Sequence, residues 1–481
     1  MQLASTTVLP HRSRFLFASL LLLSFSASQA QDNSPYSRYG LGNQFPRFNV
    51  QSRGMGGVSA AYVGTYLGYA NADANNTRDS IPFTEVISVN YNNPASYAFF
   101  QANLEPRSKQ VASARVILDA GVNFSSRKLA EPNTPQSFRA SDALFSHVYV
   151  GIPIRRNWGL AFGIRPLTRI AYDIVRSERL TDPVTGNNID SAVSRFTGTG
   201  GSFLPTIGTG VGIGNLSLGA NIGYLFGKKE IATRRVFVND SVEYAASNHT
   251  TNTSFGNLFF TAGAQYKIEF SRNSILRLGV TGNWKQTLDG TQDILRQTYV
   301  RSSTGEESRI DSVFQQGDVA GEIIYPANYT VGFMFDHAAS EKARGWNVGV
   351  DYETSQWNDF RFFGQKDLVQ DNWEMRFGGQ LTPIRRPTRY GQSISWRFGG
   401  FVGEDYVNID NNKLPVYGLT FGLGLPVFNY NRQSLGQYSV INLAFEYSKR
   451  GNNQSRIRED LFRVSVGFNF TDLWFGKRRY D

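Results

Sequence analysis

The side chains best suited to catalysis or metal binding are few and widely spaced in this sequence. The 481 residues include no cysteine and four histidines. His147, His249 and His337 lie far apart, without the short spacing of metal ligands or catalytic motifs, and His11 lies in a segment that we expect to be removed. Ser146 precedes His147, but alternation along a strand would point these two side chains to opposite faces. The sequence therefore predicts no metal site, no cofactor and no enzyme activity.

The charge balance does not favour nucleic-acid binding. The chain carries 49 Lys+Arg and 39 Asp+Glu, a formal net charge of +10, yet charged residues make up only 18% of it. Proteins that bind nucleic acid usually concentrate basic residues in one run or on one face, and no such run stands out here. The glycine-rich stretch 208–214 is not followed by a helical pattern, so we do not interpret it as a phosphate-binding loop.

The first thirty residues have the composition of a secretory signal peptide. Two arginines make the start basic, residues 15–25 form an apolar run, and Ser28 and Ala30 are the small residues that precede a cleavage site. We therefore expect cleavage before Gln31. The alternative is an N-terminal membrane anchor, but this apolar run is shorter than the roughly 20 residues that a spanning helix needs.

The rest of the chain is dominated by alternation of apolar and polar residues, the pattern of a strand whose two faces meet different surroundings. Most of the alternating segments have the length of a strand that crosses a bilayer at a tilt, about 9–11 residues. There are fourteen, at residues 115–125, 143–154, 158–166, 204–213, 216–226, 257–270, 275–284, 328–336, 346–353, 372–381, 393–402, 416–425, 439–447 and 461–470.

Alternation alone does not separate a membrane barrel from a water-soluble sandwich, but the connections do. Short turns at 155–157, 214–215 and 271–273 alternate with long connections, as tight periplasmic turns and long extracellular loops do in outer-membrane barrels. The long connections are 176–203, 227–256 and 285–327. Tryptophan and tyrosine near the segment ends fit interfacial girdles. We predict an all-β fold, a transmembrane antiparallel barrel of about fourteen strands in a Gram-negative outer membrane, surrounded by its lipid and with both termini periplasmic.

Residues 31–114 differ from the segments that follow. They are rich in glycine, asparagine, serine and tyrosine and show little alternation. The lumen of a fourteen-strand barrel must hold water or a plug, and a segment of this composition could fold into it. The alternative is a disordered periplasmic tail. We predict a signal peptide at 1–30, a lumenal plug or hatch at 31–114, the barrel at 115–470 and a basic periplasmic tail at 471–481.

Two short motifs in the N-terminal segment resemble those of a known family. Residues 53–61 read RGMGGVSAA, and an Asn-Pro-Ala tripeptide follows at 93–95. This pair of motifs, ahead of fourteen amphipathic segments, is similar to the long-chain fatty acid transporter (FadL/TodX-like) family of outer-membrane barrels. The resemblance implies a hatch inside the barrel. The hatch residues that it singles out are Gly54, Gly56, Gly57, Asn93, Pro94 and Ala95.

The same resemblance draws attention to the third segment of the barrel. Members of the family release substrate sideways through a kink in this strand. Pro166, which follows Gly163, could mark such an opening, because proline cannot donate a hydrogen bond to the ladder. The alternative is that Pro166 simply marks the rim end of the strand.

Parity also places charged residues of both signs on the inward faces of the predicted strands. Mixed signs are not typical of an ion-selective ring. One interpretation is a salt-bridged network that holds the plug, and the other is a path for a carboxylate-headed lipid with arginines at its head group. The residues are Arg115, Arg165, Arg277, Glu374, Arg376, Arg397 and Glu446.

Two hypotheses about function follow. The first, implied by the resemblance, is passive uptake of small hydrophobic molecules such as long-chain fatty acids, with lateral exit through the wall. The second is a non-transporting barrel that serves as an accessory or docking subunit of an outer-membrane secretion or assembly complex. A transporter needs an apolar pocket joined to a gap in the wall, whereas an accessory barrel can be fully blocked. The expected partner is therefore either a small hydrophobic ligand or the subunits of such a complex.

Overall fold

The structure is a computed structural model that describes most of the chain after the predicted signal peptide. The predicted signal peptide and most of the predicted basic tail lie outside the described residues. No helix in the described part of the chain is long and apolar enough to cross a membrane. The described residues are 33–64, 87–100, 102–104, 111–132, 134, 136–181, 184, 186, 188–238, 244–271, 273–301, 307–384, 387–409, 412–427 and 438–474.

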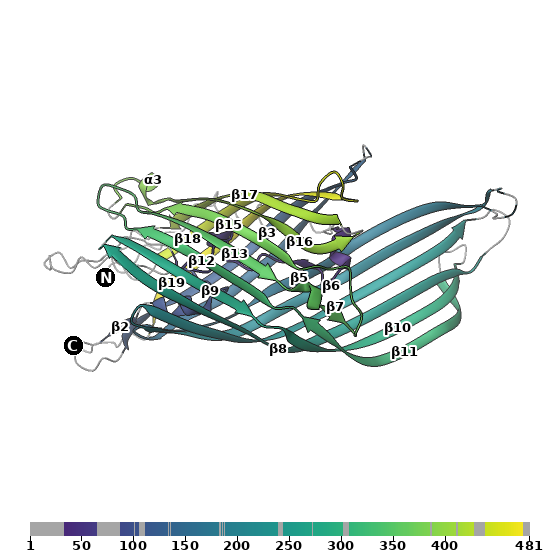
Figure 1. The fold of residues 1–481 in the computed structure, drawn as a ribbon, viewed down its shortest axis with the longest axis horizontal. Helices are drawn as coiled ribbons and strands as arrows, with labels where there is room; N and C mark the ends of the chain where they lie inside the picture. Colours follow the sequence, from purple (N-terminus) through teal and green to yellow (C-terminus); the bar gives the residue numbers. More distant parts are fainter. Residues whose placement is uncertain are drawn as a thin grey trace, which may run out of the picture.

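Fourteen antiparallel strands form a closed transmembrane barrel, and each corresponds to one of the fourteen alternating segments (Figure 1). The last strand closes the barrel on the first, in a ladder that runs from Arg458↔Ala130 to Trp474↔Ala114. The strands are β3 (Val111–Ala130), β4 (Ser137–Arg155), β5 (Trp158–Thr181), β6 (Asn188–Ile213), β7 (Leu216–Val238), β8 (Ala246–Ser271), β9 (Ser274–Asn283), β12 (Asn328–His337), β13 (Trp346–Ser355), β15 (Asn372–Leu381), β16 (Ser395–Ile409), β17 (Asn412–Val427), β18 (Tyr438–Arg450) and β19 (Arg458–Trp474).

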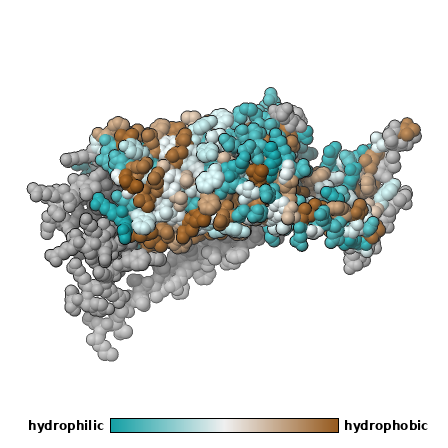
Figure 2. Space-filling view, turned by 60° about the horizontal axis from the view of Figure 1, so that its bottom comes forward, coloured by the Kyte–Doolittle hydropathy of each residue, from teal (hydrophilic) through white to brown (hydrophobic). Residues whose placement is uncertain are grey.

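The outer face of the barrel is apolar. Large hydrophobic side chains such as Leu218, Phe333 and Phe468 are between 42% and 50% exposed there, and their neighbours along each strand face the lumen. Figure 2 shows apolar side chains gathered over the barrel body and mostly hydrophilic ones toward the end of the barrel from which the extension projects, on the right. Trp158 and Trp346, which the sequence places at a membrane interface, lie on this outer face. Lipid would cover such a surface, as in other transmembrane barrels.

The three long connections of the predicted barrel are not loops, so that part of the prediction was wrong. Strands β5 to β8 continue past the barrel mouth, and a further hairpin joins them, formed by β10 (Gln286–Arg301) and β11 (Glu307–Tyr325). Together they form one six-stranded antiparallel sheet, which projects to the right in Figure 1. We call it the extension. It comprises residues 169–181 of β5, 188–201 of β6, 227–238 of β7, 246–256 of β8, 289–301 of β10 and 307–320 of β11.

The extension escaped the sequence pattern because it has no buried face along most of its length. Residues 247–254 read SNHTTNTS, which suits a strand in its threonine content but carries polar residues on both faces. In the wall, β8 pairs with β9, and beyond the rim it pairs with β10. The strand is therefore continuous, although its sequence loses the apolar–polar alternation that marks it in the wall.

The two mouths of the barrel differ in their connections. At one mouth β4, β6 and β8 turn into the next strand within two residues, as predicted. A longer connection there holds the short helix α3 (Tyr390–Ser393). At the other mouth stand the extension and an inserted connection with η3 (Trp357–Asp359) and β14 (Arg361–Phe362). We call these ends the turn mouth and the hairpin mouth.

The N-terminal segment lies inside the barrel. Its helix α2 contacts β17, β18 and β19, and its helix η2 contacts β4 to β8 on the other side. A segment that touches opposite walls of a closed barrel must occupy the lumen, and nearly all of its described residues are buried. We call residues 33–64 and 87–100 the plug. Its elements are η1 (Pro35–Arg38), β1 (Asn43–Gln44), α2 (Val50–Arg53) and η2 (Pro94–Phe99), and β2 (Ala102–Leu104) then pairs with β3.

The described chain begins and ends at opposite mouths. The Nδ2 of Asn33 donates to the carbonyl oxygen of Asp173 in the extension at 3.2 Å, whereas Trp474 pairs with Ala114 at the turn mouth. The expectation that both termini are periplasmic concerns residues outside the described part of the chain, so it stays a prediction.

A side chain at Gly399 should dislodge the plug. A Cβ there would lie 2.3 Å from the carbonyl carbon of Met55 and from the amide nitrogen of Gly56, and neither backbone atom can yield without moving the plug. Overpacking costs about 1–3 kcal/mol. We expect Gly399→Ala to lower the temperature at which the folded barrel shifts its mobility on a gel and to speed proteolysis of the plug. Gly391→Ala, where a Cβ would meet nothing within 4 Å, is the control. Equal behaviour of the two variants would contradict this packing.

Candidate functional site

The glycine-rich turn of the plug meets the barrel wall backbone to backbone. Gly56 and Gly57 have φ values of +70° and +91°, which glycine adopts at little cost. A Cβ at Gly54 would lie 3.0 Å from the Cα of Gly422 in β17. Strands β15 and β16 of the wall also have glycines at this contact. A Cβ at Gly378 in β15 would lie 2.1 Å from the carbonyl oxygen of Met55. The three glycines of the first motif therefore lie together at one contact.

The Asn-Pro-Ala motif starts η2 and anchors the plug to the opposite wall. The side chain of Asn93 accepts the N–H of Ala95 at 3.1 Å, and its Nδ2 donates to the carbonyl oxygen of Ala60 at 2.6 Å. Here too the wall has glycines, since a Cβ at Gly219 would lie 2.3 Å from the carbonyl carbon of Pro94. Asn93 thus caps η2 and ties it to the glycine-rich half of the plug.

A chain of buried hydrogen bonds joins the plug to β3 and β4. Arg53 donates from Nη2 to the Oγ of Ser146 at 3.0 Å, and this Oγ lies 2.9 Å from the Nδ1 of His147. The Nε2 of His147 lies 3.0 Å from Oδ1 of Asp119, whose Oδ2 accepts the N–H of Val89 at 3.0 Å. A proton on Nε2 lets each donor in the chain meet an acceptor. The chain therefore starts and ends in the plug.

A β-bulge in β4 makes this arrangement possible. The ladder between β3 and β4 changes register between His147↔Gly121 and Phe145↔Val122, which leaves Ser146 without a partner on β3. A bulge re-aims the side chains around it, and both Ser146 and His147 are buried against the plug. The expectation that these two side chains point to opposite faces was wrong for this reason.

The order Ser–His–Asp resembles that of a hydrolase triad, but its surroundings do not suit catalysis. Ser146, His147 and Asp119 are at most 3% exposed, and none of them lines the cavities described below. A nucleophile needs space for the reacting atom, and the hydroxyl of Ser146 is already engaged by Arg53. The arrangement is suited to clamping the plug. Within the described ranges, no group of three or more His, Asp or Glu side chains could hold a metal ion.

A cavity of about 220 Å³ lies between the plug and strands β13 to β19, toward the hairpin mouth. Three of the predicted inward charges line it. Arg376 pairs with Glu353 and with Glu374, each at 2.6 Å, and Arg463 pairs with Glu446 at 3.0 Å. Because these carboxylates and guanidinium groups are paired with one another, the charged part of the lining forms an ion-pair network and does not suit an apolar solute.

The other four predicted inward charges contact the plug or the adjoining strands. Arg165 lies over the ring of Tyr91 in the plug, 5.4 Å from its centroid. Arg397 donates from Nε to Gln380 at 2.6 Å and from Nη1 to Asn442 at 2.9 Å.

Arg277 and Arg115 complete this set. Arg277 forms a buried ion pair with Asp336, and its guanidinium lies 5.7 Å from the ring centroid of Phe99 in the plug. Arg115 lies at the start of the barrel and donates to Oγ1 of Thr471 at 3.4 Å.

Two further polar anchors of the plug were not among the predicted site residues. Asp351, buried in β13, accepts the N–H groups of Ser59 and Ala60 at 2.7 and 2.8 Å. Lys229, buried in β7, donates from Nζ to the carbonyl oxygen of Gly40 at 2.8 Å. Parity along the predicted strand does place Asp351 inward, but Lys229 lies in a segment expected to be a loop. In both cases the partners are backbone groups, which leave no trace in the sequence.

A second set of ion pairs, also missed, holds the start of the plug at the hairpin mouth. Ser34 donates from Oγ to Glu459 at 2.6 Å, and Arg127 pairs with the same carboxylate at 2.6 Å. Arg450 pairs with Asp405 at 2.8 Å nearby. These residues come from the plug and from four different wall strands, so their spacing in the chain gives no signal.

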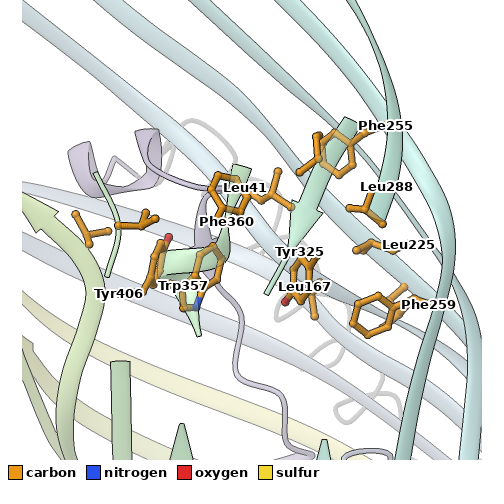
Figure 3. Packing of buried hydrophobic residues seen from close by; sticks show 14 of the residues in the cluster. Leu41, Leu167, Leu225, Phe255, Phe259, Leu288, Tyr325, Trp357, Phe360 and Tyr406 are labelled. Atoms are coloured by element: carbon orange, nitrogen blue, oxygen red, sulfur yellow. The ribbon is translucent and has the colours of Figure 1, made fainter. Parts of the chain in front are cut away.

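Apolar side chains close the hairpin mouth above the charged cavity (Figure 3). Trp357 and Phe360 come from the connection between β13 and β15 and are fully buried. Trp357 stacks on Tyr406 with ring centroids 4.3 Å apart, and Leu41 of the plug packs in the same cluster. The mouths of transporting barrels would hold an apolar solute in such a place. Here the apolar surfaces pack on one another.

Pro166 lies where the second and third barrel strands separate. β4 and β5 pair only as far as Val148↔Ile164, and beyond that point β5 pairs with β6 and, at Thr168 and Arg169, with β1 of the plug. The ladder to β6 changes register between Pro166 and Thr168. A small cavity of about 30 Å³ lies beside the plug where β4 and β5 separate, and most of the residues that line it are polar. The plug therefore occupies the place where the wall parts.

Gly163, the other residue singled out in this strand, pairs with Tyr149 near the end of the β4–β5 ladder. A Cβ there would lie 2.2 Å from the carbonyl oxygen of Val148 and 2.5 Å from the ring of Tyr149. The residue therefore allows the close approach of a large inward side chain.

The profile of the family described as BamG matches residues 77–481 of this chain. No curated protein matches the sequence. Among solved structures, the chain is similar in fold to a FadL homologue of Pseudomonas aeruginosa, at 12% identity and a TM-score of 0.48, covering 90% of this chain and 100% of the other. It is similar to the CymD monoaromatic hydrocarbon channel at 14% identity and 0.46, covering 90% and 98%. For the toluene transporter TodX of P. putida the values are 13% and 0.45, covering 90% and 99%.

Removal of the guanidinium at residue 53 should release the plug. Arg53→Met leaves Ser146, Asn123 and the hydroxyl of Ser465 without a buried donor, and each such loss costs about 1–3 kcal/mol. We expect a lower melting temperature and faster proteolysis within the plug. Arg156→Met, in an exposed turn, is the control and should behave as wild type. A stable, protease-resistant Arg53→Met protein would show that the clamp is dispensable.

Ser146 should be inert as a nucleophile. A fluorophosphonate probe, which labels activated serines, should leave the folded wild-type protein unmodified, because the hydroxyl is buried and already accepts from Arg53. Intact-mass measurement checks this. A wild-type adduct that disappears in His147→Ala would mean that the Ser–His–Asp chain is catalytic.

Proposed function

The chain belongs to the BamG family, and we propose that it is a docking subunit of an outer-membrane assembly complex. The observation that carries this proposal is the extension. Four strands, β5 to β8, continue from the barrel wall, and the hairpin of β10 and β11 joins them in a sheet that presents two faces beyond the membrane. Because these four strands are continuous with the barrel, the sheet is anchored to it. Such a platform suits the positioning of partner proteins.

The blocked lumen supports the same function. The plug is fixed to the wall by backbone contacts at glycines, by the hydrogen bonds of Arg53 and by Asp351. The cavity of about 220 Å³ is lined in part by ion pairs, and the apolar residues of the hairpin mouth are packed together. An apolar solute gains free energy from buried apolar surface, at about 25 cal/mol per Å², and a charged cavity supplies little of it. These features favour a scaffold over a channel.

A second candidate function is passive uptake of small hydrophobic molecules such as long-chain fatty acids. The parting of β4 and β5 beside Pro166 favours it, since a gap in the wall is what lateral exit requires. In that case the plug would have to move away from the seam during transport. Its many buried polar contacts make such movement costly.

Shortening the extension separates the two functions. We would delete residues 173–197, 231–251 and 295–315, each between positions paired across a hairpin, and join the ends with Asn-Gly turns. The barrel should stay heat-modifiable on a gel, because the deletions lie beyond the apolar cluster of the hairpin mouth. We expect the outer-membrane proteins that copurify with the wild-type chain in mild detergent to be lost.

Uptake of a labelled long-chain fatty acid by liposomes provides the complementary measurement. We expect wild-type liposomes to take up no more than protein-free ones. Uptake by the wild type that is lost in Pro166→Val, together with unchanged copurification in the shortened variant, would favour the transport function instead.

A further inference from the structure

One edge of the extension is open along β5. Beyond Ile164 this strand pairs with β6 on one side, and of the described residues only those of the plug pair with its other side, at the base of the extension. From Val175 to Thr181, about 20 Å of strand, this second side has no strand partner among the residues that the structure describes. Closed barrels have no such edges, so an open one here needs an explanation.

The direction of the free backbone groups follows from the contacts at the base. The N–H of Ala171 donates to the Oγ of Ser37 at 3.1 Å, and its carbonyl oxygen accepts the N–H of Ser34 at 2.9 Å. The N–H of Asp173 donates to the Oδ1 of Asn33 at 3.3 Å, and the carbonyl oxygen of Asp173 accepts from the Nδ2 of Asn33 at 3.2 Å.

Backbone groups of residues two apart in a strand point to the same side. Val175, Ser177 and Arg179 therefore present their N–H and carbonyl groups to the open edge, in line with Ala171 and Asp173. The plug already uses the lower part of this edge as a template for an extended segment, and the upper part continues in the same register, because the ladder with β6 is unshifted from Thr168 to Leu180.

The other edges of the sheet are built differently. The outer strand β11 has three register shifts in its ladder with β10, and Asp318 within it has a φ of +54°. Strand β4 is bulged at Ser146, at the base of its open edge, and its ladder with β3 is unshifted from Phe145 to Ser137. Bulges are a common means of preventing unwanted strand pairing at an edge, and the β5 ladder has none between Thr168 and Leu180. Of the two outer edges of the extension, β5 is therefore the one suited to regular pairing.

The charges beside this edge indicate the chemistry of an incoming strand. Arg176 and Arg179 flank Ser177 and, by parity, project from opposite faces of the sheet. The side chain of Arg176 is 72% exposed, and its ion pair with Glu178 in the same strand is long, at 3.5 Å. A strand added here would meet an arginine on each face, so acidic side chains on both of its faces would be favoured.

We propose that residues 175–181 of β5 bind an extended, acidic segment of a partner protein by β-strand addition. The inference rests on the proposed docking function and names the surface that performs it. Main-chain hydrogen bonds supply affinity in this mode, and the alternating side chains supply selectivity. The partner strand would continue along the edge that the plug begins to cover.

Ser177→Pro tests the proposal directly. The N–H of Ser177 points to the open edge, so proline removes a donor that a partner strand needs and no hydrogen bond between β5 and β6. We expect at least a tenfold loss of the proteins that copurify with the full-length chain in mild detergent, with an unchanged gel shift on heating. Ser177→Val keeps the N–H and should retain them. Full retention by Ser177→Pro would overturn the proposal.

The acidic character of the partner has its own test. Arg176→Glu combined with Arg179→Glu leaves the backbone edge intact and reverses both charges. We expect this variant to lose copurifying proteins as Ser177→Pro does. Retention by the double variant alongside loss by Ser177→Pro would overturn the acidic assignment.

Hydrogen exchange shows whether the edge itself is covered. In the isolated protein the amides of Val175, Ser177 and Arg179 should exchange freely, and in the native complex at least tenfold more slowly. Equal exchange in both states would overturn the proposal. The variant with the shortened extension distinguishes failure of the strand-addition proposal from failure of the docking function. Loss of partners in the shortened variant with retention in Ser177→Pro would leave docking in place at another surface, and retention in both would end both proposals.

Discussion

The close approach of the plug backbone to the barrel wall is the contact on which the rest of the structure depends. A strand wall that faces lipid outside must hold its polar side inward, and a lumen of this width has to be filled. At Gly54–Gly57 and again at Pro94, the plug lies so near the wall that a single added Cβ would reach backbone atoms. Glycine on both partners removes the side chains that would otherwise hold the two backbones apart. This packing brings the polar groups of plug and wall within hydrogen-bonding distance.

Buried charges become tolerable only because that distance is short. Asp351 and Asp119 accept backbone N–H groups of the plug, and Arg53 reaches three different wall strands. A buried charge without such partners would cost several kcal/mol. The plug is therefore held by many geometrically specific bonds, and a movement that breaks one of them would strain the rest. A lumen built in this way suits a rigid support better than a passage.

The extension carries the sheet of this rigid barrel beyond the membrane. A barrel normally removes every sheet edge by closing on itself. Here β5 to β8 continue beyond the closed part, joined there by β10 and β11, and open edges reappear at β4, β5 and β11. The β11 edge is interrupted by bulges, whereas the β5 ladder is regular from Thr168 to Leu180. The plug contributes at this point too, since Asn33 and Ser34 occupy the base of the β5 edge and leave the upper part open.

The sequence by itself determined the barrel, because a strand between lipid and a polar lumen must alternate, and fourteen segments do. It also placed the glycine and Asn-Pro-Ala motifs in the segment that became the plug, and it put the charged side chains of Arg376 and Arg397 inward by parity. It could not determine the extension, whose strands carry polar residues on both faces and so lack alternation. Nor could it place Ser146, since one bulge reverses the parity of a side chain, or predict that Glu459 would meet Ser34 across 425 residues. Such contacts depend on the closure of the barrel around the plug, and only the tertiary structure decides them, because they join residues that no local pattern links.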